Sequence, residues 1–334
     1  MSSPAEVIQS IPISRESSLL VANTRTVISD ILKGRSNKLL VIVGPCSVHD
    51  PIAAIDYAKH LADARQQYQQ QLEIVMRVYF EKPRSTIGWK GLINDPDLDG
   101  TFDINKGLRV SRQLLADINQ LGVPAGTEFL DIVTGQYYSD LISWGAIGAR
   151  TTESQVHREM ASGLSCPVGF KNGTDGNIKI AVDAVLAARH PHWFLSPTEN
   201  GKTAIMSTSG NADAHIILRG GKQPNYDAAS ISQVRELSLA NGVDTRVIVD
   251  CSHANSGKQF ERQVDVARDI SQQIARSETQ IAGCMIESNL IEGRQDFNPR
   301  APLTYGQSIT DACLGWEQTG RVLDGLARAV ADRG

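Results

Sequence analysis

The sequence of 334 residues predicts an α/β protein: a (β/α)8 barrel of the TIM type with an N-terminal extension and an inserted β-hairpin. Eight short apolar runs recur along the chain, and a stretch with helical spacing of its apolar residues follows each run. Near-continuous apolar strands that alternate with helices indicate a parallel sheet covered on its outer face, and eight such units close into a barrel. A doubly wound open sheet is the alternative. It is disfavoured because Gly44-Pro45-Cys46-Ser47, after the first run, does not match the fingerprint GxGxxG.

The predicted elements occupy residues 39–334, which we expect to form one barrel domain. The expected strands are 39–43, 73–80, 123–129, 146–150, 168–171, 215–219, 246–250 and 281–287. The expected helices are 52–70, 104–121, 136–142, 155–162, 178–188, 228–240, 258–275 and 311–330. Each strand is short and has a polar or charged residue at its end or within a few residues of it, so the polar residues should gather at one rim of the barrel.

Two segments lie outside this alternation. Residues 1–38 form the extension, with a β-prone piece at 7–13 and a helix at 16–32 whose apolar face should pack on the main body or on a second subunit. Residues 192–210 read as a hairpin around the Asn200-Gly201 turn, inserted before the sixth strand.

Composition and charge narrow the possible partners. The formal net charge is -4 and the basic residues are scattered, so nucleic acid is not expected as a partner. No apolar stretch approaches the roughly 18 residues that cross a bilayer, and the first residues lack the pattern of a signal peptide. Five widely spaced cysteines without a CxxC motif indicate thiols rather than disulfides. We therefore expect a soluble, cytoplasmic protein with no membrane partner.

Four potential metal ligands come from distant parts of the chain. Cys46 follows the first expected strand, His253 the seventh, Glu287 ends the eighth and Asp311 lies beyond it. A thiolate, an imidazole and two carboxylates can hold a divalent transition metal. Taken singly, Cys46 could be a buried apolar filler, His253 a turn cap and Asp311 a helix N-cap. Their shared position near strand ends favours the metal site.

A second group of residues is cationic. It consists of Arg77, Lys82, Arg84, Arg150, Lys171 and Arg219, near the ends of four expected strands. These charges lie beside apolar residues and glycines, where a cation must be paired or must bind an anion. Arginine matches phosphate and carboxylate oxygens in bidentate fashion, so one or two phosphorylated substrates are indicated. Glu128, at the third strand, could pair with a cation or position a water molecule.

Several ordered motifs resemble one enzyme family, the feedback-regulated microbial class I 3-deoxy-D-arabino-heptulosonate 7-phosphate (DAHP) synthases. The resemblance covers nearly the whole chain and is carried by Gly44-Pro45-Cys46-Ser47, 80–86, 88–96, 145–154, 169–174, Leu218-Arg219-Gly220-Gly221 and Asp250-Cys251-Ser252-His253. It implies a metal-dependent barrel that condenses phosphoenolpyruvate with erythrose 4-phosphate and water and releases phosphate, the first step of the shikimate pathway.

The resemblance also implies roles for individual residues. It gives Cys46, His253, Glu287 and Asp311 as metal ligands, Arg77, Lys82, Arg150, Lys171 and Arg219 as the phosphoenolpyruvate site, and Arg84 and Ser85 as the erythrose 4-phosphate site. Family members often have threonine at the Ser85 position. Lys82 is expected to protonate the alkoxide formed from the aldehyde, and Glu128 with Lys171 to position the water. The metal could be Mn, Fe, Co or Zn, with Mn favoured.

Regulation and assembly are further implications. The effector of such enzymes is an aromatic amino acid, expected here near Gly135, Gln136 and Ser165. Forms sensitive to phenylalanine or tyrosine tend to have proline at the Gly135 position, so tryptophan is favoured. A homotetramer or homodimer is expected.

Two rival functions remain open. The first is 3-deoxy-octulosonate 8-phosphate synthase, which uses arabinose 5-phosphate, although the motif Lys82-Pro83-Arg84-Ser85 favours the four-carbon sugar. The second is a non-catalytic barrel with a structural metal and regulatory anions.

Overall fold

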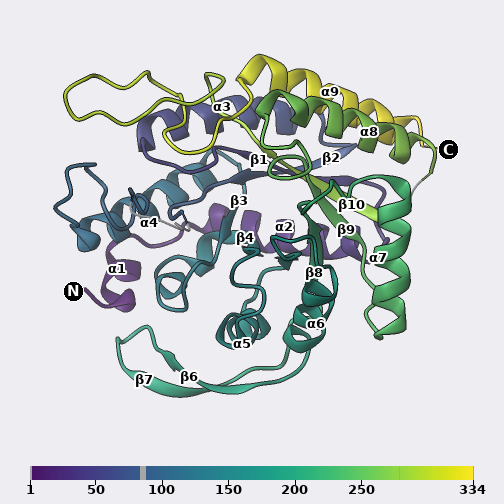
Figure 1. The fold of residues 1–334 in the computed structure, drawn as a ribbon. Coiled ribbons are helices and arrows are strands. Elements are labelled where there is room, and N and C mark those ends of the chain that lie inside the picture. Colours follow the sequence, from purple (N-terminus) through teal and green to yellow (C-terminus); the bar gives the residue numbers. More distant parts are fainter. Residues whose placement is uncertain (1, 83–87, 278, 334) are drawn as a thin grey trace.

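The computed structural model describes residues 2–82, 88–277 and 279–333. Within these ranges, eight parallel strands form a closed barrel in the order β1-β10-β9-β8-β5-β4-β3-β2 (Figure 1), which confirms the predicted fold class. The strands are β1 (Leu39–Gly44), β2 (Leu72–Arg77), β3 (Ala125–Glu128), β4 (Ile142–Ile147), β5 (Val168–Lys171), β8 (His215–Leu218), β9 (Val247–Asp250) and β10 (Ile281–Glu287). Two of them, β5 and β10, have the predicted bounds.

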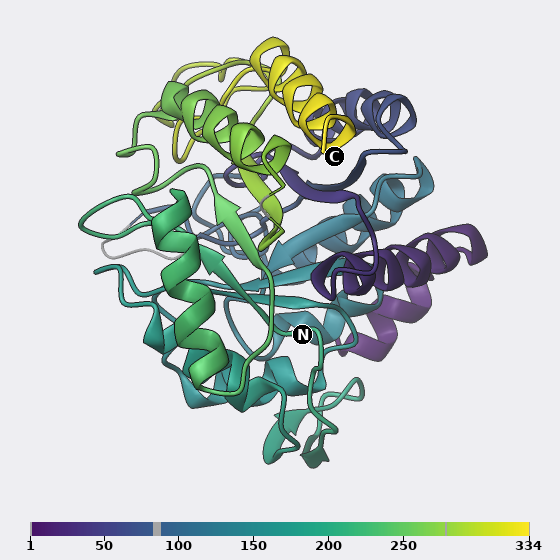
Figure 2. The same ribbon diagram turned by 90° about the vertical axis from the view of Figure 1, so that its right-hand side faces the viewer.

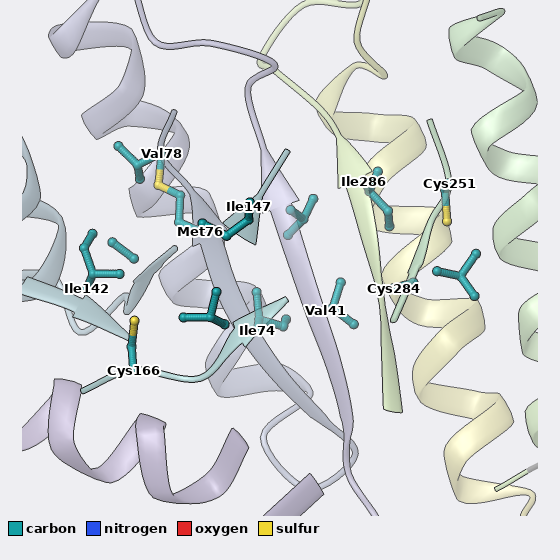
Figure 3. Close-up of a cluster of buried hydrophobic side chains, with 14 of the residues drawn as sticks. Val41, Ile74, Met76, Val78, Ile142, Ile147, Cys166, Cys251, Cys284 and Ile286 are labelled. Carbon is teal, nitrogen blue, oxygen red and sulfur yellow. The ribbon is translucent and has the colours of Figure 1, made fainter. Parts of the chain in front are cut away.

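Helices surround the strands, as Figure 2 shows. They are α3 (Pro51–Gln67), α4 (Ile104–Gln120), α5 (Gln155–Gly163), α6 (Lys179–Ala188), α7 (Ala228–Ala240), α8 (Gln263–Ala275), preceded by the 3-10 turn η3 (Phe260–Arg262), and α9 (Trp316–Ala331). An apolar layer lies between helices and strands (Figure 3), where Val41 of β1 is in register with Ile74 of β2 and Cys284 of β10. All three side chains are buried, so neighbouring strands contribute to one continuous layer.

The connection between β3 and β4 differs from the prediction. The helix predicted at 136–142 was wrong, because the segment forms two 3-10 turns, η1 (Thr134–Tyr137) and η2 (Ser139–Leu141). Asp131 starts this turn structure, since its Oδ1 accepts hydrogen bonds from the amides of Val133 at 2.6 Å and Thr134 at 2.7 Å. Strand β4 begins at Ile142, four residues before the predicted start. The prediction placed the start too late because Ser143 and Gly145 interrupt the apolar run.

The first helix was also missed. The β-prone interpretation of 7–13 was wrong: α1 (Pro4–Ser10) is helical over most of that segment. Ser3 and Glu6 form a capping box and Pro4 occupies the first turn, and these start signals outweigh the β-branched residues that follow.

Helix α2 (Arg15–Leu32) closes the amino end of the barrel. Arg25 donates to the carbonyl of Ile142 at 2.9 Å, and Arg246 donates to those of Ile31 at 2.7 Å and Ile281 at 3.0 Å. Ile142 and Ile281 are the first residues of β4 and β10, so α2 lies at the strand starts. Side chains of α2 enter the interior cluster, which includes Ile28, Ile31, Leu32, Leu40, Ile42, Val75, Trp144, Ile217, Ile248 and Met285. The predicted helix thus packs on the main body.

The predicted hairpin is present and extends away from the barrel wall (Figure 1). Strands β6 (Trp193–Pro197) and β7 (Thr203–Ser207) pair in antiparallel fashion, and Gly201 adopts φ +73° in the turn between them. Several of its apolar side chains are solvent-exposed, including Trp193 at 74% and Ile205 at 70%. Among the described residues, the helices are too short or too polar for any to traverse a bilayer.

Candidate active site

The carboxyl ends of β1 and β10 bring three of the predicted metal ligands together. Ligand atoms of Cys46, Glu287 and Asp311 lie within 4.8 Å of one another. The turn that presents Cys46 depends on Gly44, because a Cβ atom there would lie 2.6 Å from the carbonyl oxygen of Arg77. Asp311 is not a helix N-cap, since α9 begins only at Trp316. A thiol and two carboxylates this close form a donor set that fits a divalent transition metal.

The ammonium group of Lys82 neutralises part of this cluster. Its Nζ lies 2.6 Å from Cys46 Sγ and 2.8 Å from Asp311 Oδ2. Burial alone would lower the pKa of Lys82, but Cys46, Glu287 and Asp311 raise it well above its ordinary value. Burial and the nearby Glu287 raise the pKa of the Cys46 thiol to about 11, although Lys82 opposes this. The three neighbouring ligand side chains therefore keep Lys82 protonated beside the candidate metal site.

His253, the fourth predicted ligand, is oriented by Asp250. His253 lines the same cavity but lies outside the three-residue cluster. Its Nδ1 donates to Asp250 Oδ2 at 2.9 Å, which leaves Nε2 for a ligand, and Ser252 Oγ donates to Asp250 Oδ1 at 2.8 Å. Burial would raise the pKa of Asp250, but Lys171, whose Nζ is 2.9 Å away, and His253 hold it well below its usual range.

Asp250 was overlooked by the sequence reasoning. The available signal was its position as the polar last residue of the predicted strand 246–250, the same criterion that identified Glu287.

A cavity of about 720 Å³ at this end of the barrel unites most of the predicted residues. Its lining includes Arg77, Lys82, Glu128, Arg150, Lys171, Arg219, His253, Glu287 and Asp311. Residues that the prediction missed also line it, among them Tyr79, Lys258 and Arg294. Arg84 and Ser85 lie outside the described residues. Apart from that pair, the chain brings its predicted substrate residues to one cavity.

Arg77 is fully buried at the base of this cavity. Its Nη2 donates to Glu287 Oε1 at 3.1 Å and its Nε to the carbonyl of Pro45 at 3.0 Å, while its guanidinium carbon lies 3.5 Å from the centre of the Tyr79 ring. Burial would lower the pKa of Arg77, but Tyr79 and Glu287 raise it. Arg77 is therefore a fixed positive charge that links the strand ends of β2 and β10.

Arg150 and Arg219 carry positive charge that no carboxylate in the described ranges pairs with. Arg219 makes one weak contact, to the carbonyl of Gly220 at 3.4 Å. Burial lowers the pKa of Arg219, and the positive charge of Arg150 lowers it further, although Asp250 opposes both. Two like charges on the wall of one cavity can bind a phosphate or carboxylate group.

The predicted effector residues lie away from this cavity. Gly135 and Gln136 belong to η1, and Ser165 lies in the loop between α5 and β5. A Cβ atom at Gly135 would lie 3.2 Å from the ring of Phe129. The N-terminal segment contacts both η1 and the hairpin. Tyr137 Oη donates to the carbonyl of Ser2 at 2.8 Å, and the amide of Ala5 in α1 donates to the carbonyl of Glu199 at 2.8 Å.

These features define a class of protein: a (β/α)8 barrel enzyme with a candidate metal centre and a cavity for anionic substrates at the carboxyl ends of its strands. The DAHP synthetase I family matches residues 10–324. The chain belongs to that family. It is thus an enzyme of the shikimate pathway that catalyses the DAHP synthase reaction, and the family implies a divalent metal.

Individual relatives agree with this assignment. The chain is 58% identical over 330 residues to the Phe-sensitive phospho-2-dehydro-3-deoxyheptonate aldolase of Escherichia coli K12, covering 99% of this chain and 94% of the relative. It is 57% identical over 330 residues to the Trp-sensitive enzyme of the same strain, covering 99% and 95%. A solved phospho-2-dehydro-3-deoxyheptonate aldolase from Francisella tularensis SCHU S4 superimposes with a TM-score of 0.98 at 50% identity, covering 100% of this chain and 98% of the other. Because Phe- and Trp-sensitive relatives are equally close, overall similarity does not distinguish the effector.

Proposed function

We propose that phosphoenolpyruvate binds through Arg77, Lys82, Arg150, Lys171 and Arg219, and that erythrose 4-phosphate binds through Arg84 and Ser85. The juxtaposition of Arg150 and Arg219 without a carboxylate partner carries this proposal. A phosphate or carboxylate group between them would offset the repulsion between the two guanidinium groups.

Cys46, His253, Glu287 and Asp311 would hold the divalent metal, with Mn favoured over Fe, Co and Zn. Support comes from the 4.8 Å cluster of three of them and from the hydrogen bond between His253 Nδ1 and Asp250, which leaves the opposite ring nitrogen available. When bound, the metal supplies a Lewis acid that polarises the aldehyde of erythrose 4-phosphate.

The remaining chemistry belongs to side chains of the cavity. Lys82 would donate a proton to the alkoxide that forms when C3 of phosphoenolpyruvate attacks the aldehyde carbon, which its position 2.8 Å from Asp311 in the candidate metal cluster supports. Positive charge then develops at C2, and a water molecule that Glu128 and Lys171 help to position adds there before the C–O bond to phosphate breaks. Cys46 and His253 contribute as metal ligands.

Phosphate release from phosphoenolpyruvate tests the substrate assignment. We expect release to require erythrose 4-phosphate, to be at least tenfold slower with arabinose 5-phosphate, and to stop after chelation and return with Mn²⁺. Preference for arabinose 5-phosphate would favour the octulosonate synthase. Metal binding without any phosphate release would favour a non-catalytic barrel.

Tryptophan is proposed as the effector, because glycine at position 135 avoids the close contact that the side chain of a proline would make with the ring of Phe129. The test is inhibition by tryptophan, phenylalanine and tyrosine of the wild type and of Gly135→Pro. Tryptophan should inhibit the wild type most strongly, and the variant should lose tryptophan inhibition. Inhibition by tyrosine or phenylalanine alone would contradict the proposal.

A homotetramer or homodimer is proposed, with the apolar face of the β6–β7 hairpin as a contact between copies. Trp193, Leu195 and Ile205 are at least two-thirds exposed, which is unusual for side chains of this size on one short hairpin. Light scattering of the wild type and of Trp193→Ser should show a larger mass for the wild type.

Residues 39–334 would form the catalytic barrel and 1–38 the extension.

The cytoplasm is the proposed compartment, since all five cysteines are buried free thiols.

A further inference from the structure

Tyr79 offers an unused hydrogen-bond donor inside the active-site cavity. It lies just beyond the end of β2, is 2% exposed and lines the cavity. Its hydroxyl is buried and has no hydrogen-bond partner in the described structure. Leaving a buried hydroxyl unpaired is costly, so most such groups in folded proteins have a partner. Its ring is held in place by the Arg77 guanidinium 3.5 Å away.

Glu128 offers an unused acceptor in the same cavity. Its Oε1 is also buried without a partner in the described ranges. The carboxylate faces Gly148, where a Cβ atom would lie 2.6 Å from Oε1, so a side chain at that position would displace it. Among the carboxylates that raise the pKa of Tyr79, after the dominant effect of burial, Glu128 acts most strongly. Both residues line the same cavity, and the Glu128 carboxylate is close enough to Tyr79 to act on its phenol, so we assign the two unpaired groups to one region of the cavity.

The charges of this region select a neutral molecule. Anionic oxygens of the substrates are attracted to the arginine and lysine side chains that line the cavity and are repelled by the Glu128 carboxylate. A phenol donates one hydrogen bond and a carboxylate accepts one, and a water molecule between them can do both. The DAHP synthase reaction consumes one water molecule, so this pair has a reactant of matching chemistry.

We propose that Tyr79 Oη and Glu128 Oε1 together hold the water molecule that adds to C2 of phosphoenolpyruvate. This inference rests on the proposed function of the cavity. Tyr79 donates to the water oxygen, and Glu128 accepts a proton from it as the bond from that oxygen to C2 forms. The C2=C3 electron pair meanwhile makes the bond to the aldehyde carbon, and the aldehyde oxygen takes a proton from Lys82.

The second half of the reaction restores both groups. When the C2–O bond to phosphate breaks, the leaving phosphate takes the electron pair and the proton from Glu128. The C2 hydroxyl loses its proton, which returns Lys82 to its charged form through solvent, and C2 becomes the ketone of the product. Tyr79 keeps its own proton throughout, which agrees with a phenol whose pKa burial raises far above neutrality.

The variant Tyr79→Phe tests this role, because it removes only the hydroxyl and keeps the ring beneath Arg77. We expect kcat to fall about tenfold, the loss of one hydrogen bond to the reacting water, while KM for both substrates and the Kd of phosphoenolpyruvate change less than twofold. Tyr138→Phe is the matched control. Tyr138 is also a fully buried phenol, its hydroxyl makes one long contact of 3.3 Å to Thr134, and it does not line the cavity.

A double-mutant cycle with Glu128→Gln makes the test specific. Glu128→Gln alone should lower kcat about 100-fold. If both residues act on one water molecule, the double variant should be within about threefold of Glu128→Gln alone.

Three results would overturn the proposal. Unchanged kcat in Tyr79→Phe would show that the hydroxyl has no role in turnover. An additive loss of about 1,000-fold in the double variant would show that the two groups act separately. A rise in phosphoenolpyruvate KM at constant kcat would place the hydroxyl on the substrate instead. Absence of phosphate release from the wild type would count against the function of the cavity itself, independently of Tyr79.

Discussion

The two ends of the barrel differ in what fills them. At the carboxyl ends of the strands, the side chains are a thiol, carboxylates, an imidazole and several cations around an open cavity. At the amino ends, Ile28, Ile31 and Leu32 of α2 pack among apolar side chains of the barrel interior and are at most 5% exposed. The carboxyl end gathers polar and charged groups around a cavity that is open to ligands, whereas the amino end is apolar, well packed and closed.

This contrast separates two kinds of mutational effect. Removing an unpaired cation such as Arg219 at the carboxyl end should change catalysis with little effect on stability, because no carboxylate in the described ranges pairs with it and Arg150 repels it. Removing an apolar side chain at the amino end should lower stability and leave the chemistry intact. The following predictions test this division, starting with the largest expected effect.

Cys46→Ala should lower kcat/KM by at least about 1,000-fold, because a thiolate ligand of the proposed metal site is lost. Metal content by mass spectrometry and phosphate release should fall together. Cys166→Ala is the control, since Cys166 is also a fully buried thiol but lies in the apolar layer outside the barrel strands. Normal activity of a metal-free Cys46→Ala protein would remove Cys46 from the metal site.

Ile31→Ala should lower the free energy of unfolding by about 3 kcal/mol, because a cavity opens among the packed side chains at the amino end. The kcat of the folded variant should stay within twofold of the wild type. Leu19→Ala, on the same helix but 55% exposed, should cost less than about 0.5 kcal/mol. Urea unfolding measures both. Equal losses in the two variants would contradict a role for α2 as a closure of the barrel.

His215 should make the amino half of the barrel sensitive to acid. Burial lowers the pKa of His215 to about 4, and its Nε2 accepts a hydrogen bond from the indole of Trp144 at 3.1 Å. In the unfolded chain the group protonates near pH 6.5, so unfolding takes up a proton between about pH 6.5 and 4. The free energy of unfolding should therefore fall with decreasing pH across this window, by up to about 3 kcal/mol from this group.

The contribution of His215 can be isolated with His215→Gln, whose side-chain oxygen can still accept from Trp144. The difference in unfolding free energy between this variant and the wild type should shrink or reverse as the pH falls from 6.5 to 4. A constant difference across the window would show that His215 does not titrate as inferred.

Arg219→Gln should raise KM for phosphoenolpyruvate about 10- to 100-fold, because one of the two uncompensated guanidinium groups is removed. The free energy of unfolding should be unchanged or slightly higher, since the repulsion from Arg150 is relieved. Arg235→Gln is the control at the other end of the barrel, where Arg235 is an exposed residue of α7. Equal effects on KM would show that only general electrostatic attraction is involved.

Much of the barrel could be predicted from the sequence because parallel strands are buried on both faces. Runs such as 168–171 and 281–287 are apolar or small along their length, and they end where the strands end. Strand β4 was placed too late because Ser143 and Gly145 resemble a turn, although both are buried in the strand. Helix α1 was missed because its start signals, not its apolar pattern, specify it.

In the candidate site, the sequence predicted the residues that stand out by their charge or by their position at the end of a strand. Glu287 was found because it ends a strand with a residue that has no apolar explanation, and Cys46 because it follows a strand end close to other potential ligands, although alone it could be an apolar filler. Tyr79 was missed because a tyrosine within an apolar run reads as core, and only the surroundings of its hydroxyl distinguish it. The orientation of His253 toward Asp250 depends on a backbone with φ +57°, which residue type does not reveal.

Helix α2 has a consequence for the order in which the molecule must be assembled. Its apolar residues form the floor of an interior whose walls come from β1 to β10, so the surface on which α2 packs is complete only when the last strand, β10, has joined the sheet. A polypeptide starting at Leu39 would leave that floor missing and admit water to the base of the barrel. The N-terminal extension, residues 1–38, thus completes the core of the barrel through α2.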